Sequence, residues 1–285
     1  MENPNLDYFL RRWAERKKPA ALSGRELWNK KSDSWVRNFD RPNGESKNRR
    51  RLASVAAHLR QWGQLRPIHR VVDIGCGPGF YVTEFARTAG HVLGVDISDR
   101  MLDYAQAHAR QEGVENVSWQ IADFPGQVDI AALGWEKSFD LVFTSTTPAF
   151  AGPEALRQVH RMSRGYCFHT GWISRSNSLI SELTRRLRGE APEAGEPGES
   201  TYALFNILWL MGCQPAINYY REESEDLVAV TPERVEYYAE RVLGASDAEA
   251  GAAVRKELGK MAAEGDLRER LEAVFAWTLW RTPGE

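Results

Sequence analysis

The chain has 285 residues, of which 42% are hydrophobic, and its formal net charge at pH 7 is −2. This length is enough for one large α/β domain, alone or with a small subdomain. A nearly balanced charge excludes a global basic field that would attract nucleic acid or an anionic membrane. We therefore expect no nucleic-acid partner.

The three cysteines, Cys76, Cys167 and Cys213, are scattered without paired spacing. This is typical of a reducing compartment and argues against a zinc site, so we expect no bound metal. The segment Met1–Ala20 is polar and lacks the apolar core of a signal peptide. No run approaches the roughly 18 apolar residues of a membrane span. These patterns predict a cytoplasmic protein without a membrane span.

Residues 1–65 precede the α/β pattern and carry two tryptophans, Trp28 and Trp35, about two helical turns apart. One interpretation is an amphipathic helix that packs its aromatic side chains on the domain. The other is a lid over a bound cofactor, because aromatic faces exclude water from a reaction. We treat this segment as an N-terminal helical lid or extension, with both tryptophans as candidate cofactor contacts. The basic run Asn48–Arg51 opens a predicted helix and indicates a solvated helix face.

The central motif of the chain is a short apolar strand, predicted over residues 70–74, that ends in a glycine turn. Its glycines stand at alternate positions: Gly75, Gly77 and Gly79. Glycine permits a sharp turn and close approach of a ligand, and the helix predicted over 81–88 would offer free N–H groups. The pattern predicts a nucleotide-binding element, with an ordinary tight βα connection as the alternative. Asp73 would repel a pyrophosphate but could support a cationic ligand, such as a sulfonium or an ammonium group.

Two further carboxylates follow the next predicted strands, Asp96 after residues 91–95 and Asp123 after residues 117–121. Asp96 lies close to the separation of about 20 residues at which an acid commonly meets ribose hydroxyls. The side chains after it, Ile97 and Met101, would pack on a planar ring. Asp123 could accept from an exocyclic amine while the N–H of Phe124 donates to a ring nitrogen. The two strand ends therefore suit an adenosine.

The remaining pattern continues the alternation of strands and helices. Strands are predicted over 139–143, 165–171, 217–221 and 274–281, and helices over 153–163, 174–188, 201–211 and from Pro232 onward. The apolar helix at 201–211 is either a core helix or a wall of a substrate pocket. We interpret residues 172–214 as a helical insertion that caps the site within a domain covering 66–285.

Four runs carry a family resemblance: VDIGCGPG (72–79), GVDIS (94–98), ADF (122–124) and FDLV (139–142). They resemble the class I S-adenosylmethionine-dependent methyltransferases, most of all the small-molecule branch of ubiquinone and menaquinone biosynthesis. The resemblance implies an α/β fold: a Rossmann-like three-layer αβα sandwich around a seven-stranded, mostly parallel sheet whose last strand is antiparallel. It implies S-adenosylmethionine as cofactor and S-adenosylhomocysteine as product.

The same resemblance assigns roles to the residues named above. The turn residues Gly75, Cys76, Gly77 and Gly79 line the methionyl part, and Asp73 reaches the amino group through water. Asp96 takes the ribose, Asp123 and Phe124 hold the adenine, and Thr144 lies near the sulfonium. The Asn/Asp-Pro-Pro-aromatic motif used on nucleobase amines is missing, since residues 144–150 replace it. This departure puts nucleic-acid N-methylation in doubt.

The predicted reaction is methyl transfer to a small-molecule acceptor by in-line attack on the sulfonium methyl in a water-excluded pocket. His169 is the leading candidate for a general base because histidine titrates near neutral pH. Tyr219 and Tyr220 are the alternatives, of which at most one points inward. A non-catalytic S-adenosylmethionine-binding or scaffold protein is the competing class, and a nucleic-acid methyltransferase is the third. We expect a monomer or homodimer.

Overall fold

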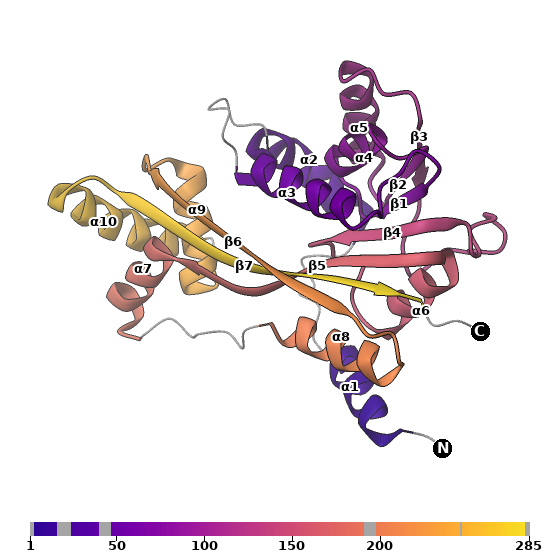
Figure 1. Cartoon of the computed structure of the whole chain (residues 1–285). Coiled ribbons are helices and arrows are strands. Elements are labelled where there is room, and N and C mark those ends of the chain that lie inside the picture. Colours follow the sequence, from indigo (N-terminus) through magenta and orange to yellow (C-terminus); the bar gives the residue numbers. More distant parts are fainter. Residues whose placement is uncertain (1–2, 16–23, 40–46, 191–197, 246, 283–285) are drawn as a thin grey trace. The chain divides into compact units, whose positions relative to one another are not determined.

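The computed structural model describes residues 3–15, 24–39, 47–190, 198–245 and 247–282 (Figure 1). The chain forms two compact units. The first unit comprises Met1–Gly171, Glu199–Tyr219 and Ala276–Glu285, and the second comprises Trp172–Gly198 and Tyr220–Phe275. Three strands, β5 to β7, each begin in one unit and end in the other.

Ten helices and seven strands are described. The helices are α1 (Pro4–Glu15), α2 (Arg25–Phe39), α3 (Lys47–Gln61), α4 (Phe80–Ala86), α5 (Asp99–Gln111), α6 (Pro153–Met162), α7 (Ser178–Arg188), α8 (Glu199–Leu210), α9 (Pro232–Leu243) and α10 (Ala248–Glu264). The strands are β1 (Arg70–Ile74), β2 (His91–Asp96), β3 (Val117–Ile121), β4 (Phe139–Ser145), β5 (Ser163–Asn177), β6 (Ala216–Leu227) and β7 (Arg268–Arg281).

The strands form one sheet in the order β3-β2-β1-β4-β5-β7-β6. β1 pairs in parallel with β2 and β4, β2 with β3, and β4 with β5. The last strand, β7, is antiparallel. The predicted α/β fold is therefore confirmed. Because β1 to β4 are parallel, their carboxyl ends meet at one edge of the sheet, beside the middle of β5, where ligands bind in open α/β sheets.

In the first unit, α2 to α5 lie on one side of the sheet and α1, α6 and α8 on the other (Figure 1). On the first side, the ring centroids of Phe143 and Phe168 stack 5.3 Å apart, and Phe85 of α4 meets Phe143 edge-on at 4.9 Å. On the second side, Val72 and Ile74 of β1 join one core with residues of α6 and α8. We call these the α4 side and the α6 side. Burial on both sides explains why β1 is an apolar run.

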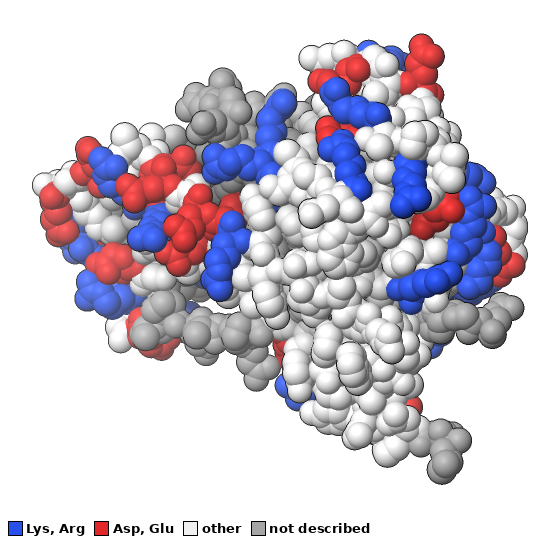
Figure 2. Space-filling view, in the orientation of Figure 1, with Lys and Arg blue, Asp and Glu red and all other residues white. Residues whose placement is uncertain are grey.

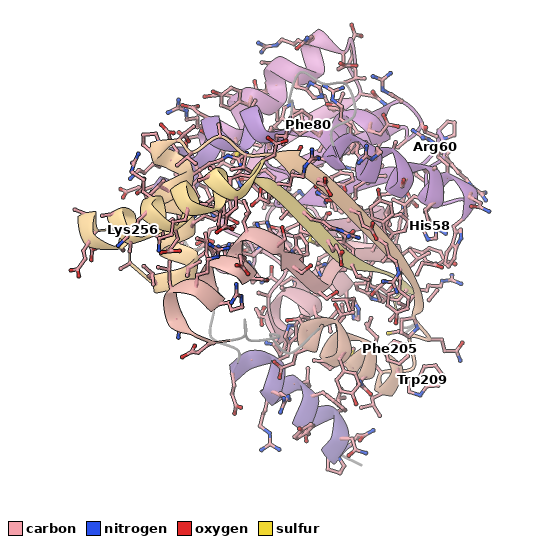
Figure 3. All side chains as sticks on the ribbon, turned by 90° about the vertical axis from the view of Figure 1, so that its left-hand side faces the viewer. His58, Arg60, Phe80, Phe205, Trp209 and Lys256 are labelled. Atoms are coloured by element: carbon pink, nitrogen blue, oxygen red, sulfur yellow. The ribbon has the colours of Figure 1, made fainter. Side chains whose placement is uncertain are left out.

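Helix α8 packs with α1 on the α6 side. Leu204, Ile207 and Leu208 of α8 are buried in the same core as Trp13 of α1. The outward residue Trp209 is 59% exposed and stacks on Phe205 with centroids 6.0 Å apart (Figure 3). One flank of the apolar helix predicted at 201–211 is thus core. The predicted insertion at 172–214 is divided, because its first part belongs to the second unit and α8 to the first.

The second unit has its own core around α7, α9 and α10, with Leu183, Tyr238 and Val254 fully or almost fully buried. The buried Glu269 accepts hydrogen bonds from Tyr238 Oη at 2.8 Å and Asn177 Nδ2 at 2.6 Å. Basic and acidic side chains alternate over the surface of these helices (Figure 2), which is typical of a solvated surface. As far as the structure describes the chain, its helices include none that combines the length and apolarity needed to cross a bilayer.

Several element boundaries differ from those predicted. The helix predicted from 174 begins at Ser178, because β5 continues to Asn177 and the Asn177 side chain accepts from Ile180 N at 3.0 Å, which caps the helix. Strands β6 and β7 extend well beyond the predicted ranges, and neither α1 nor α10 was expected. The predicted cap of α9 is confirmed, since the Thr231 side chain accepts from Arg234 N at 3.4 Å and Pro232 follows it.

Candidate active site

The glycine turn after β1 contains one glycine that faces open space and two that are packed by protein. A Cβ on Gly75 would lie 2.0 Å from Thr147 Oγ1, and one on Gly79 would lie 2.7 Å from the Trp119 ring. A Cβ on Gly77, where φ is +53°, would meet no heavy atom of a described residue within 4 Å. The backbone of Gly77 is therefore the part of the turn that a ligand can approach. Cys76 is buried, and burial raises the pKa of its thiol well above the ordinary value.

Asp96 ends β2 and ties the turn to the next helix. Its Oδ2 accepts from Gly77 N at 2.8 Å, and its Oδ1 accepts from Ser98 N at 2.9 Å. Burial raises the pKa of Asp96, while the backbone N–H donors oppose that rise. Each carboxylate oxygen keeps a further lone pair. Asp96 can thus hold the turn and accept from ribose hydroxyls at the same time.

Asp73 is the least satisfied polar group of the site. It is 2% exposed, and its Oδ2 has no hydrogen-bond partner among the described residues. Burial first and the nearby Asp96 second raise its pKa well above the ordinary value. A buried polar atom without a partner is rare in native proteins. A cationic group placed there by a ligand would satisfy this carboxylate and favour its ionised form.

The predicted adenosine contacts surround the ends of β2 and β3. Ala122 N donates to Asp96 O at 2.9 Å, which brings the two strand ends together. Asp123 is exposed there, whereas Phe124 is buried in the core. Ile97 is half-buried beside Asp96, and Met101 is buried on α5. Asp96, Ile97 and Asp123 therefore remain accessible to a ligand. The side chains of Phe124 and Met101 are buried, so a ligand can reach mainly their backbone.

Helix α2 is fastened to the amino end of α5 by polar side chains that sequence reasoning missed. Asn29 Nδ2 donates to Asp99 Oδ1 at 2.7 Å, and Asn29 Oδ1 accepts from Ser98 Oγ at 2.5 Å. One turn further along, Asp33 accepts twice from Arg100 Nη2, at 2.8 and 2.7 Å. Asn29 and Asp33 stand four residues apart, a spacing that places them on one helix face. Helix α2 therefore lies directly beside the turn that follows Asp96.

The two tryptophans of α2 are placed differently. Trp28 is half-buried, with Lys31 Nζ 5.9 Å from its ring centroid, and Trp35 is 43% exposed. The polar contacts described above, rather than these aromatic rings, fasten the helix to α5. Their predicted contact with a cofactor stays a prediction.

Thr144, near the carboxyl end of β4, meets His169 of the adjoining middle part of β5, which is its register partner. His169 Nδ1 lies 2.9 Å from Thr144 Oγ1, and the His169 ring packs on Phe150 with centroids 4.6 Å apart. Burial lowers the pKa of His169 to about 3. The imidazole is therefore neutral at pH 7 and a weak proton acceptor. The structure thus unites His169 with the predicted sulfonium contact, in an environment that suits positioning better than proton transfer.

The two candidate tyrosines lie on β6, the edge strand that β7 separates from β5. Tyr219 is 66% exposed, and the Tyr220 ring lies 6.3 Å from that of Phe275. The sheet order does not bring Tyr219 to Thr144 and His169. Both tyrosines stay predictions.

Besides the pair Thr144–His169, a second cluster of polar side chains lies at this edge of the sheet, and the sequence did not predict it. Tyr81, next to the glycine turn on α4, interacts through its hydroxyl with the side chains of Ser145 and Arg51. Its ring lies 4.8 Å from that of Phe143, on the α4 side (Figure 3 labels the adjacent Phe80). Arg51 comes from the basic run that was interpreted as a solvated helix face, but it is half-buried. No sequence motif contains these residues, because Arg51 on α3 is distant in sequence and reaches the site only when the chain folds.

Comparisons with known proteins agree with this geometry. Residues 66–185 match the family model of a methyltransferase domain. The chain is 31% identical over 112 residues to the 23S rRNA (uracil(1939)-C(5))-methyltransferase RlmD of Hahella chejuensis, covering 38% of this chain and 24% of that protein. It is 33% identical over 75 residues to the ubiquinone biosynthesis O-methyltransferase of Acinetobacter baylyi, covering 26% and 29%.

Among solved structures, magnesium protoporphyrin IX methyltransferase of Synechocystis, with bound S-adenosylhomocysteine, aligns at a TM-score of 0.50 and 17% identity, over 88% of this chain and 96% of that one. This likeness shows the fold. The matched segment is a class I methyltransferase domain, and the predicted class, S-adenosylmethionine-dependent methyltransferase, is confirmed. The chain spans about a quarter of the length of the two curated relatives, so its own acceptor does not follow from theirs.

The site fits the cofactor of this class, S-adenosylmethionine. The unpartnered Asp73 carboxylate suits its ammonium group, the open backbone of Gly77 allows close approach, and Asp96 suits its ribose.

Proposed function

We propose that the chain transfers a methyl group from S-adenosylmethionine to a small-molecule acceptor at the carboxyl ends of β1, β2 and β4. The observation that carries this proposal is the buried Asp73 carboxylate, which lacks a partner in the described structure beside a glycine turn open to a ligand. When bound, S-adenosylmethionine supplies a methyl group activated by a positively charged sulfur.

The residues of the chain then have defined tasks. Asp73 meets the ammonium group, Asp96 accepts from the ribose hydroxyls, and Asp123 with the N–H of Phe124 holds the adenine. Cys76, Ile97 and Met101 give the site its apolar walls. Helix α2, with Trp28 and Trp35, excludes water as a lid because its anchor Asn29 is already bonded to Ser98 beside Asp96.

We infer that His169 positions Thr144 rather than acting as the general base. A histidine with a pKa of about 3 holds a proton poorly at neutral pH, whereas its 2.9 Å contact fixes the Thr144 hydroxyl. Replacing His169 with asparagine, which can keep a hydrogen bond to Thr144, should preserve more activity than replacing it with leucine. A pH–rate profile that is unchanged in the asparagine variant would support the positioning role.

The direct experiment supplies S-adenosylmethionine with an isotopically labelled methyl group and a fractionated cell extract. We expect label in the small-molecule fraction with the wild-type chain and none with Asp96→Ala. Cofactor binding without transfer to any fraction would instead favour a non-catalytic binding protein. Size-exclusion chromatography with light scattering tests the expected monomer or homodimer.

Methyl transfer to RNA is the second candidate, favoured by the 31% identity to an rRNA methyltransferase. The near-neutral charge of the chain supports a small-molecule acceptor instead, and the missing amine motif argues only against N-methylation of nucleobases. The same labelling experiment separates the two. Label that ribonuclease converts from an acid-precipitable to an acid-soluble form would establish an RNA acceptor.

A further inference from the structure

The end of β4 and the adjoining middle part of β5 present two hydroxyl side chains to the α4 side of the sheet. Ser145, the last residue of β4, and Thr170 of β5 are register partners. Two residues earlier on each strand, Phe143 and Phe168 stack at 5.3 Å with 7° between their ring planes. Because side chains alternate along a strand, Ser145 and Thr170 share the face of these two rings. Thr144 and His169 occupy the opposite face.

Two helices bring further donors to the same face. Tyr81 of α4 packs its ring on Phe143 and directs its hydroxyl to the side chains of Ser145 and Arg51. Arg51 of α3 is oriented by Asn48, whose Oδ1 accepts from Arg51 Nη2 at 2.9 Å. We call Arg51, Tyr81, Ser145 and Thr170 the donor cluster. All four residues belong to the first unit.

The donor cluster is incomplete without a ligand and adjoins the cofactor site. Thr170 is 0% exposed, yet its Oγ1 has no hydrogen-bond partner in the part of the chain that the structure describes. Asp73 of β1 is the register partner of Phe143, so it lies on the same face. Buried hydroxyls are almost always hydrogen-bonded. Thr170 neighbours Ser145, whose side chain shares the Tyr81 hydroxyl with Arg51, so its unsatisfied hydroxyl indicates a place for an acceptor oxygen of a bound molecule.

We propose that the donor cluster is the acceptor subsite, and that it binds an ionisable oxygen, a phenolate or a carboxylate, of the molecule to be methylated. This inference rests on the proposed function and names its substrate class. Arginine offers several N–H donors and a permanent charge, and the three hydroxyls can each donate as well. An amine acceptor would place its own N–H groups or positive charge against Arg51. The cluster therefore selects an oxygen acid.

The chemistry of the cluster supports this choice. Burial raises the pKa of Tyr81, whereas Arg51 and Ser145 act in the opposite direction by favouring negative charge on its oxygen. Burial opposes ionisation of an acceptor oxygen as well, but such an oxygen would meet the hydroxyls of Tyr81 and Thr170 in addition to Arg51 and Ser145, so it has more donors than Tyr81 itself. These donors favour the anion, which is held at the sheet edge beside the cofactor site while its proton goes to solvent.

The test uses the full-length protein saturated with S-adenosylhomocysteine and 4-nitrophenol as the probe, because its phenolate absorbs visible light. We expect the bound probe to be the phenolate, with an apparent pKa below that of the free probe. Arg51→Gln should weaken phenolate binding by about tenfold or more, because a charge-assisted hydrogen bond is lost. The near-isosteric variants Tyr81→Phe and Thr170→Val should each weaken it several-fold without a change in the circular dichroism spectrum.

Matched probes and variants decide the outcome. Arg50→Gln alters an exposed arginine of the same helix and should leave phenolate binding unchanged. Benzoate should compete with the phenolate if carboxylates share the site, and failure to compete would restrict the site to phenols; both results fit an oxygen acid. Equal binding of benzylamine or benzyl alcohol would overturn the proposal.

Calorimetry with S-adenosylhomocysteine separates this inference from the proposed function. Its affinity should be the same in the wild type and in Arg51→Gln. A parallel loss of cofactor affinity in Arg51→Gln would mean that the cluster holds the cofactor, which overturns the acceptor subsite but leaves the proposed function standing. If the wild type binds no S-adenosylhomocysteine at all, the proposed function itself fails.

Discussion

At the end of β4 and the adjoining middle part of β5, the two faces of the sheet carry polar side chains that differ in their hydrogen bonding. On the α6 side, Thr144 and His169 bond to each other at 2.9 Å, and Phe150 covers the imidazole. On the α4 side, Asp73 and Thr170 each bury an oxygen that finds no partner in the described ranges of the chain. One face is therefore complete as it stands, and the other needs a ligand to complete it.

This difference shows that a buried polar group without a hydrogen-bond partner indicates a binding site better than the presence of a reactive residue type does. Histidine is the residue type that a sequence offers as a general base, but here burial keeps His169 neutral by lowering its pKa to about 3. A threonine and a carboxylate look unremarkable in the sequence. Only the fold shows that their oxygens are buried without partners, which costs about 1–3 kcal/mol for each such group.

The largest effect is expected at Asp96, on whose carboxylate the glycine turn depends. Asp96→Ala removes its bonds to Gly77 N and Ser98 N together with the proposed ribose contacts. Each charge-assisted hydrogen bond contributes about 1.5–3 kcal/mol, so cofactor affinity should fall at least tenfold by calorimetry. Asp103→Ala, an exposed acid on α5, is the matched control. Unchanged affinity in Asp96→Ala would rule out this assignment.

Asp73→Asn tests the α4 side, because it should change the free energy of unfolding and the affinity for the cofactor in opposite directions. The folded pKa of Asp73 lies well above its unfolded value of 3.8, so between these values the native state holds a proton that the unfolded state has lost. The free energy of unfolding therefore falls as pH rises through that window. The variant should remove this slope, be more stable than the wild type at higher pH, and bind the cofactor more weakly. Denaturant titrations at several pH values would show it; tighter cofactor binding would contradict the role.

His169 provides the corresponding test on the α6 side, where the polar groups are already paired. Its pKa falls from 6.5 to about 3 on folding, so between these values the unfolded state binds the extra proton. Stability should therefore decrease as pH falls below 6.5, by at most about 1.4 kcal/mol per pH unit. His169→Gln should flatten this part of the pH–stability curve in urea titrations. An identical slope in the variant would show that His169 does not titrate in this way.

The smallest effect is expected at the anchor of α2. Asn29→Ala removes the contacts to Ser98 and Asp99 at 2.5 and 2.7 Å, which should cost about 0.5–1.5 kcal/mol each at most. In the wild type, S-adenosylhomocysteine should slow proteolysis near Lys30 and Lys31, and the variant should lose most of that protection. Cleavage that is equally fast with and without ligand in the wild type would leave α2 as a packing helix only.

The first half of the sheet was predictable because each strand there ends in its own signal. The glycine run after β1 and the acids after β2 and β3 identify the strand ends to within a residue, and the parallel order then brings Asp73 and Asp96 together. The family resemblance supplied the remaining topology. The second half of the chain gave no such signal, because the parts of β6 and β7 beyond the predicted ranges, EESEDL (222–227) and RERLEA (268–273), are mostly charged and do not resemble strands.

What the sequence could not reveal is contact between distant segments. Arg51 and Tyr81 stand 30 positions apart and join only because α3 packs on α4. Asn29 and Asp33 lie between the two tryptophans of α2 and belong to no motif, although their spacing of four is a visible sign of one helix face. A polar atom lacks a hydrogen-bond partner only if none of its neighbours in the fold provides one. No local sequence pattern contains this information.

The central claim is that a ligand lies against the open glycine of the turn, and one pair of variants tests it most directly. Gly77→Ala and Gly113→Ala both add a methyl group at a left-handed glycine, with φ of +53° and +68°, where no described atom lies within 4 Å. The backbone strain of the two is therefore matched, at about 1–2 kcal/mol. Calorimetric titration with S-adenosylhomocysteine should show binding abolished or weakened by at least about tenfold in Gly77→Ala and unchanged in Gly113→Ala. Equal affinities in the two folded variants would place the cofactor elsewhere and contradict the account.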